Sequence, residues 1–206
     1  MKVLIACEES QVICSAFRAR GHDAYSCDLK QCSGGFPEFH IQGDALREAY
    51  SEKYDLMIAH PPCTYLSYAG TSHWNDPGRL WARLDALKFF AALWLAPIEK
   101  ICLENPKGCA SPTIAKYDQE IQPHYFGDAS LKTTWLWLKN LPMLLHFEQL
   151  DLFSDKTHVN KPDPIYVSES GKRLYFSESI SGNGGGSEAR SKSFTGIAKA
   201  MAAQWS

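Results

Sequence analysis

The sequence predicts an α/β protein with a mostly parallel sheet, and two observations support this prediction. Short apolar runs recur along the first half of the chain without polar alternation, which is typical of strands that are buried on both faces. Segments with helical periodicity separate these runs, as in 10–21, where apolar residues recur on one face. Strands that alternate with helices indicate a parallel sheet with helices on both sides.

The expected elements can be assigned in chain order. Ser10 is the expected N-cap of the first helix and Gly21 its stop signal. Later, two runs are expected to pair as antiparallel strands that close the sheet, and Ser170-Gly171 marks a hairpin turn. The expected strands are 2–7, 22–29, 54–60, 99–105, 120–127 and 132–138, the hairpin is 165–177, and the helices are 10–21, a short one within 43–54, 79–96 and 194–205.

Length and composition predict one domain over 1–206, with a loop-rich segment at about 141–190. The net charge of −2 excludes a highly basic nucleic-acid coat protein. No signal peptide is expected, and no apolar run approaches the ~18 residues that span a membrane. Seven cysteines without a CxxC pair indicate reduced thiols in a cytoplasmic protein. Cys27, Cys32 and His40 match no zinc-site spacing, so no metal is expected.

Polar or reactive residues follow each of the main predicted strands. Because ligands bind beyond the carboxyl ends of strands in such sheets, we expect this edge to be a functional site. The residues at these ends are Cys7-Glu8-Glu9, Asp28, Pro61-Pro62-Cys63 and Glu104-Asn105-Pro106.

The motifs PPC (61–63) and EN (104–105), in this order at two strand ends, resemble those of the cytosine-C5 DNA methyltransferases. The acid at the end of the second strand, the Gly43-Asp44 pair and the final helix also agree with that family. The chain is more closely similar to small methyltransferase-like proteins that bacteriophages often carry, with which it shares phrases such as HPPCTYLS. The resemblance implies a Rossmann-like S-adenosylmethionine methyltransferase sheet with an antiparallel edge hairpin.

The resemblance also implies roles for individual residues. Cys63 would be the nucleophile and Glu104 the second catalytic residue. S-adenosylmethionine would be the methyl donor, and DNA the partner, either duplex with a flipped base or single-stranded. The implied location is the cytoplasm of a bacterial or phage-infected cell. The candidate cofactor-binding residues are Glu8, Asp28, Asp44 and Pro61, and the candidate substrate-binding residues are Pro62, Thr64, Asn105, Pro106 and Arg190.

The chemistry explains these residue types. A thiolate that adds to C6 of cytosine makes C5 nucleophilic, and cysteine both attacks well and leaves again. Glu104 would hold the exocyclic amine and protonate N3, a task for which burial is expected to raise its pKa. A base in duplex DNA must leave the stack for this reaction. Trp74, in the loop after Cys63, is a candidate for stacking on that base.

Three departures from the family keep other readings open. The first loop is CEES, with no glycine before Gly21, although glycine lets a ligand approach the backbone closely. The family's arginine pair is not visible, and Lys132 is the nearest cation. The recognition segment is short, with its cations at 172, 173, 190 and 192. The alternatives are an enzyme that modifies a free pyrimidine nucleotide such as dCMP or uses a modified donor, and a binding protein that has lost catalysis.

Overall fold

The computed structural model describes residues 1–146, 161–168, 170–171, 173–175 and 193–206. Within these residues, seven strands form one sheet in the order β3-β2-β1-β4-β5-β7-β6. The pairs from β3 to β5 are parallel, and β7 runs antiparallel to both β5 and β6. The strands are β1 (Lys2–Ala6), β2 (Asp23–Asp28), β3 (His40–Gln42), β4 (Leu56–Ala59), β5 (Lys100–Pro106), β6 (Gln119–Ile121) and β7 (Thr134–Lys139).

This arrangement confirms the predicted α/β class and is consistent with a Rossmann-like fold. The chain moves outward from β1 to β2 and β3, and then returns to add β4 and β5 on the other side of β1. The direction of winding therefore changes between β1 and β4, and such a switch point is where open α/β sheets bind ligands.

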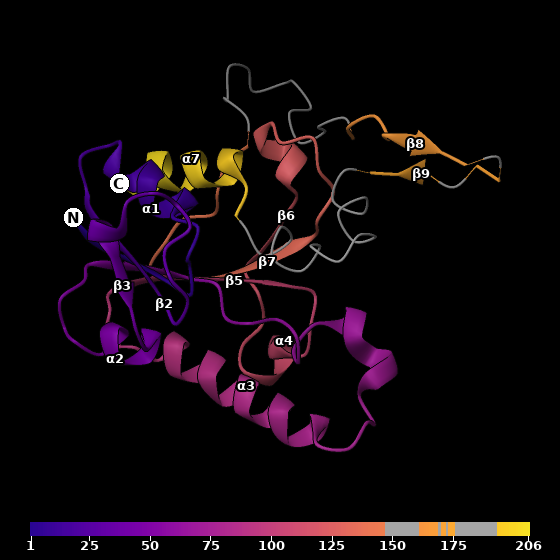
Figure 1. The fold of residues 1–206 in the computed structure, drawn as a ribbon, viewed down its shortest axis with the longest axis horizontal. Coiled ribbons are helices and arrows are strands. Elements are labelled where there is room, and N and C mark those ends of the chain that lie inside the picture. Colours follow the sequence, from indigo (N-terminus) through magenta and orange to yellow (C-terminus); the bar gives the residue numbers. More distant parts are fainter. Residues whose placement is uncertain (147–160, 169, 172, 176–192) are drawn as a thin grey trace.

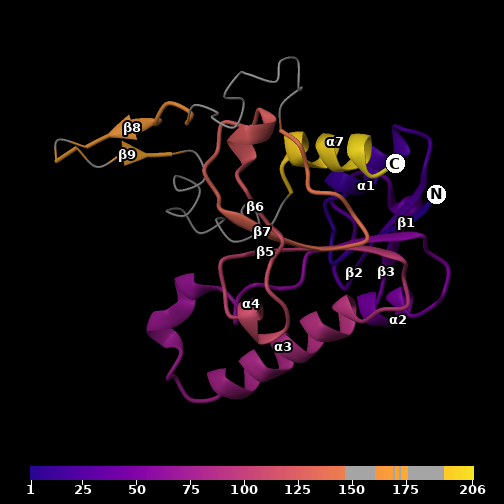
Figure 2. The same cartoon turned by 180° about the vertical axis from the view of Figure 1, so that it is seen from behind.

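Helices cover both faces of the sheet (Figure 1), which explains why the strands lack polar alternation. One face carries α1 (Val12–Arg18) and α7 (Thr195–Gln204), and the other carries α2 (Ala45–Ala49), α3 (Arg79–Trp94) and α4 (Ala110–Thr113). Figure 2 shows the same two layers from behind.

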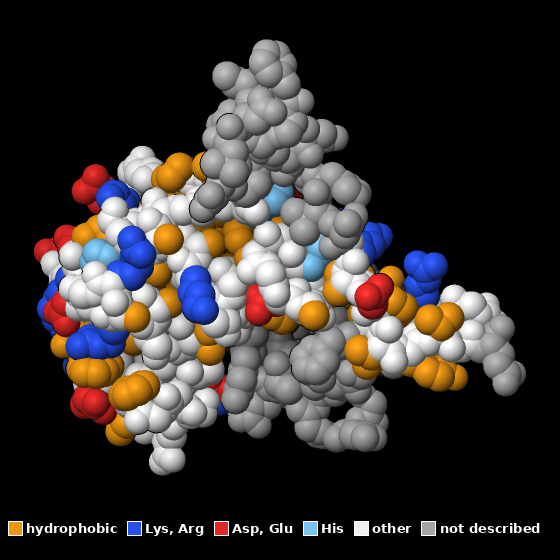
Figure 3. Space-filling view, turned by 90° about the horizontal axis from the view of Figure 1, so that it is seen from above, with side chains coloured by type: hydrophobic (Ala, Val, Ile, Leu, Met, Phe, Trp, Pro, Cys, Tyr) orange, Lys and Arg blue, Asp and Glu red, His pale blue; other side chains and the backbone are white. Residues whose placement is uncertain are grey.

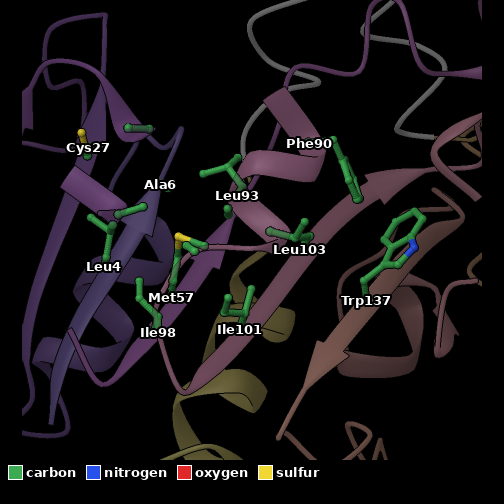
Figure 4. Packing of buried hydrophobic residues seen from close by; sticks show 14 of the residues in the cluster. Leu4, Ala6, Cys27, Met57, Phe90, Leu93, Ile98, Ile101, Leu103 and Trp137 are labelled. Atoms are coloured by element: carbon green, nitrogen blue, oxygen red, sulfur yellow. The ribbon is translucent and has the colours of Figure 1, made fainter. Parts of the chain in front are cut away.

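Each layer encloses its own hydrophobic core, because successive residues of a strand point to opposite faces. Leu4 and Met57 face the α3 side, where Phe90 packs edge-on against Trp137 at 4.9 Å between ring centroids (Figure 4). Val3 and Ile5 face the opposite side, together with residues of α1 and α7. The expected burial of one face of the final helix is confirmed at Ile197 and Met201.

Three sequence expectations need correction. Ser10 does not cap α1: the cap residue is Gln11, which has a left-handed backbone and makes no side-chain cap hydrogen bond. The strand β3 was not expected, because three residues are too few to produce a recognisable pattern. The predicted pair of antiparallel strands is present, but β7 lies between β5 and β6, and the segment from Pro123 to Phe126 is a 3₁₀ helix.

The predicted late hairpin is present as β8 (Tyr166–Val167) and β9 (Arg173–Leu174), which pair antiparallel outside the main sheet. Most of the expected recognition segment, including Arg190, lies outside the described residues. In the part of the chain that is described, no helix combines the length and the apolar character needed to cross a bilayer.

Candidate active site at the carboxyl ends of β4 and β5

The carboxyl ends of β4 and β5 bring His60 and Glu104 together. Ala59 pairs with Leu103 in the last register position, and the next residue of each strand carries a polar side chain. Nδ1 of His60 lies 3.0 Å from Oε2 of Glu104, with side-chain exposures of 14% and 18%. The two expected motifs are therefore adjacent in space, and an imidazole joins them.

Backbone hydrogen bonds connect the loop after β4 to the segment after β5. The Tyr68 amide donates to the carbonyl of Lys107 (2.9 Å), and the Cys109 amide donates to that of Leu66 (2.8 Å). Gly108 lies at this contact, where a Cβ would come within 2.2 Å of the Leu66 carbonyl oxygen. A glycine is therefore required for the two segments to approach this closely.

Asn105 adds a side-chain link between the same two segments. It is 2% exposed, and its Nδ2 donates a 2.6 Å hydrogen bond to the carbonyl of Pro61, which is also buried. The sequence suggested that Asn105 binds substrate. The structure shows that Asn105 holds the cysteine loop against β5, and its binding of substrate stays a prediction.

Cys63 lies at the start of an exposed turn. Its carbonyl accepts hydrogen bonds from the amides of Leu66 and Ser67 (3.0 and 2.9 Å), so the backbone turns back immediately after it. The side chains of Pro62, Cys63 and Thr64 are exposed, in contrast to those of Cys14, Cys27 and Cys102, which are buried. Cys63 is thus the cysteine of this site that a dissolved molecule can reach.

A small pocket opens beside Glu104, on the α1 and α7 side of the sheet. Its lining combines polar side chains, among them His60, Glu104 and Lys132, with apolar side chains from α1 and α7. Lys132 reaches this edge because β7 is antiparallel and begins where β5 ends, with Thr134 paired to Pro106. The full lining is Ile13, His60, Glu104, Lys132, Thr134, Ser193, Phe194, Ile197 and Met201.

The electrostatics of Glu104 differ from the sequence expectation. Burial alone would raise its pKa, but the hydrogen bond from His60, the charge of Lys132 and the hydroxyl of Thr134 together lower the pKa to about 2. The expected rise is therefore wrong for the substrate-free protein, in which Glu104 is ionised at neutral pH.

Glu8 lies near His60 and caps α1. It is 4% exposed, and its two carboxylate oxygens accept hydrogen bonds from the amides of Ile13 (2.8 Å) and Cys14 (3.2 Å). Burial raises the pKa of Glu8, and the nearby His60 and these amides oppose that rise. Glu8 thus performs the capping that the sequence assigned to Ser10.

Two of the predicted donor-binding residues, Asp28 and Asp44, lie at the ends of β2 and β3. Asp28 ends β2, and its carbonyl accepts from the Gly43 amide (2.9 Å), which brings Asp44 close to it. Burial, with the charges of Asp28 and Asp44, raises the pKa of the Cys7 thiol to about 12. The two carboxylates therefore share their surroundings with the first residue after β1.

The first loop lacks glycine but contains two glycine-like conformations. Cys7 (φ 60°) and Gln11 (φ 56°) both occupy the left-handed region, which non-glycine residues rarely adopt. Such outliers cluster at ligand sites. The close approach to this loop is made by Gly34, where a Cβ would come within 2.5 Å of the Ser10 carbonyl oxygen.

The segment after Cys63 is braced by two arginines. The guanidinium of Arg79 lies 5.0 Å from the Tyr65 ring centroid, and that of Arg83 lies 4.1 Å from the Trp74 ring centroid. Trp74 is half-buried beneath Arg83, so the expected stacking of Trp74 on a base remains a prediction that would require this contact to open.

Charges of both signs are mixed on the molecular face that Figure 3 shows, where Lys and Arg side chains alternate with acidic and uncharged ones. Of the expected recognition cations, Arg173 belongs to β9, and residues 172, 190 and 192 lie outside the described residues. Among the residues that the structure describes, no group of three or more His, Cys, Asp or Glu side chains is placed to hold a metal ion.

Two residues of this pocket, His60 and Lys132, were not predicted from the sequence to be site residues. His60 directly follows β4 at the position that corresponds to Glu104 in β5, and this correspondence is the sequence signal for its role. Lys132 was noted as the nearest cation, but only the reversed direction of β7 brings it into the pocket. No protein-family model and no curated protein sequence matches this chain.

Proposed function

We propose that this protein transfers a methyl group from S-adenosylmethionine to C5 of cytosine in DNA, with Cys63 as the nucleophile. One observation carries the proposal: the exposed cysteine loop that follows β4 is hydrogen-bonded, through Pro61 and Asn105, to the strand that carries Glu104, beside the switch point of the sheet. The strand order and the PPC and EN motifs support the same activity.

The residues divide the reaction between them. The Cys63 thiolate gives an electron pair to C6, an S–C6 bond forms, N3 gains a proton, and C5 becomes nucleophilic. Glu104 accepts a hydrogen bond from the exocyclic amine and stabilises the protonated N3. After C5 has gained the methyl group, a base removes the C5 proton, the thiolate leaves, and N3 returns its proton. The net change replaces one hydrogen of cytosine by the methyl group of the donor, whose sulfonium becomes a neutral thioether, and releases one proton.

The ionised state of Glu104 fits this role. A carboxylate that is already charged forms an ion pair with a protonated N3, and in a partly buried pocket such a pair is worth more than it is in water. Lys132 faces the same pocket, where its ammonium can donate to the O2 carbonyl of a pyrimidine. This role corresponds to that of the missing arginine pair.

The donor side of the site offers a suitable set of acceptors. A nucleoside sulfonium presents ribose hydroxyls, an exocyclic amine, an ammonium and a positive sulfur, and these groups match carboxylates. Asp28 would hold the ribose and Asp44 the adenine, beside the left-handed backbone of Cys7. When bound, the donor supplies a methyl group as an electrophile.

The test is covalent trapping on an oligonucleotide that contains 5-fluorocytosine, in the presence of donor. Fluorine cannot leave C5 as a proton does, so the Cys63 adduct should persist and shift the protein band. Cys63→Ser should abolish the adduct, and Cys32→Ser, a change at a half-buried cysteine outside the pocket, should leave it intact. Absence of a Cys63-dependent adduct on every DNA tested would refute the proposal. An adduct only with the nucleotide 5-fluoro-dCMP would favour the free-nucleotide alternative.

A further inference from the structure

His60 lies beside the half-buried carboxylate of Glu104 and near the buried carboxylate of Glu8. Its Nδ1 contacts Glu104 Oε2 at 3.0 Å, and its backbone amide donates to the Ala6 carbonyl (3.0 Å), which fixes its position between β1 and β5. The side chain is 14% exposed and lines the pocket. An imidazole held at this distance from a carboxylate can exchange a proton with it.

The other ring nitrogen of His60 adds a second observation. Nε2 is buried, and within the described part of the chain it has no hydrogen-bond partner. The charged groups that surround the ring are Glu104 from β5, Glu8 from the β1–α1 loop, and Lys132 from the start of β7 on the far side of Glu104. His60 thus lies beside the carboxyl groups of two other elements, Glu104 at 3.0 Å and Glu8 nearby.

The proposed reaction leaves one requirement unmet, because a proton must reach N3 as the thiolate attacks C6. Glu104 is ionised in the substrate-free protein, so it holds no proton of its own to give. Lys132 lines the same pocket, but an ammonium is a weak acid at neutral pH. Imidazole is the side chain that ordinarily changes charge between pH 5 and 8.

We propose that His60 is a positioning residue for Glu104 and stores the proton that reaches N3 of the pyrimidine; this rests on the function proposed above. As the S–C6 bond forms, the proton on Nδ1 moves to Glu104 and from Glu104 to N3. His60 is left neutral, with its remaining proton on Nε2. When the thiolate leaves, the proton returns from N3 through Glu104 to Nδ1.

The test follows loss of tritium from an oligonucleotide that contains [5-³H]cytosine, since C5 exchanges its hydrogen once Cys63 has added to C6. His60→Asn keeps an amide donor near the place of Nδ1 but cannot store a proton. We expect it to slow exchange by roughly 10²–10³-fold, as is typical for loss of a general acid. The pH profile of the exchange rate should differ between the wild type and His60→Asn, because only the wild type has an imidazole beside Glu104.

The chain offers a matched control. Nδ1 of His73 also lies 3.0 Å from a carboxylate, that of Asp76, but on an exposed turn. His73→Asn should retain both the rate and the pH profile of the wild type. Exchange by His60→Asn within threefold of wild type, or with the same pH profile, would overturn the proposal for His60 and leave the proposed function standing. No exchange by the wild type, on DNA or on dCMP, would overturn both.

A second measurement covers the case in which His60→Asn fails to fold. The ¹⁵N shifts of the His60 ring in the wild-type protein report which ring nitrogens are protonated. The proposal requires that both ring nitrogens carry a proton at some pH between about 5.5 and 8.5. A ring that carries a single proton throughout this range has nothing to donate, and that result would contradict the proposal independently of any variant.

Discussion

Asn105 Nδ2 and the carbonyl oxygen of Pro61 are 2.6 Å apart in the interior, and this hydrogen bond fastens the cysteine loop to β5. The two residues are 44 positions apart in the sequence. The exposed Cys63 therefore belongs to a loop whose base is buried and held in place. This combination of a fixed base and an accessible tip suits a nucleophile that must meet its target in one orientation.

Replacing Asn105 tests how much this bond contributes. Asn105→Ala leaves the buried Pro61 carbonyl unpaired, so the free energy of unfolding should fall by about 1–3 kcal/mol. Denaturant unfolding measures the change. Gln42→Ala removes a similar amide-to-carbonyl bond on the exposed surface (3.2 Å, to Leu29) and should cost clearly less. Equal losses in the two variants would show that the Asn105 bond has no special weight.

Gly108→Ala tests the close contact between the two site segments. The new Cβ would come within 2.2 Å of the Leu66 carbonyl oxygen, and backbone cannot move aside cheaply. We expect a loss of about 1–3 kcal/mol in stability, typical of overpacking, and greater protease sensitivity near Cys63. Gly43→Ala is the control, since its Cβ meets nothing within 4 Å. An unchanged melting temperature for Gly108→Ala would contradict this close approach of the two segments.

The lowered pKa of Glu104 predicts a pH-dependent contribution to stability. Folding lowers this pKa from its ordinary value of 4.5 to about 2, so the ionised carboxylate stabilises the fold above about pH 4.5. This contribution, on the order of 2–3 kcal/mol, is lost as the pH falls through about 2.

The measurement is the difference in unfolding free energy between wild type and Glu104→Gln from pH 2 to 6. It should be large at pH 6 and shrink toward pH 2. Glu38→Gln, at an exposed carboxylate, controls for the loss of one negative charge. A wild-type advantage over Glu104→Gln that does not change with pH would show that Glu104 keeps its ordinary pKa.

The cysteines should differ sharply in their reactivity. Burial and nearby charges raise the pKa values of Cys7, Cys14 and Cys27 to about 12, so their reactive thiolate is scarce at pH 8. Cys63 is exposed. Brief treatment with iodoacetamide should therefore label Cys63 first, as mass spectrometry would report. Cys63→Ser should remove the fast phase, and fast labelling of Cys14 instead would contradict the burial described above.

The sequence was sufficient to predict the central parallel strands of the sheet and the positions of the PPC and EN motifs at strand ends. Continuous apolar strands identified β1, β4 and β5, and the polar residues that follow them identified the edge at which Glu104 and Cys63 lie. These features depend on local patterns, which a sequence displays directly.

The parts that the sequence did not predict depend on contacts between distant segments. The pKa of Glu104 follows from His60 and Lys132, which come from two other elements, and the cap of α1 follows from Glu8 rather than from its neighbour Ser10. The close approach of Gly34 to Ser10 in the first loop is likewise a contact between segments that are distant in the sequence. Spacing along the chain carries no signal for such pairs.

The apolar lining of the pocket has a consequence for how the protein folds. Ile197 and Met201 of α7 line the same pocket as Glu104 of β5, although more than 90 residues of sequence separate them from it. Lys132, a third lining residue, lies between β5 and α7 in the sequence. Contacts between such distant segments form slowly. A folding intermediate that contains β1 to β5 but not docked α7 would hold Glu104 in contact with water. Docking of α7 is therefore the step that we expect to bring the site into its working state.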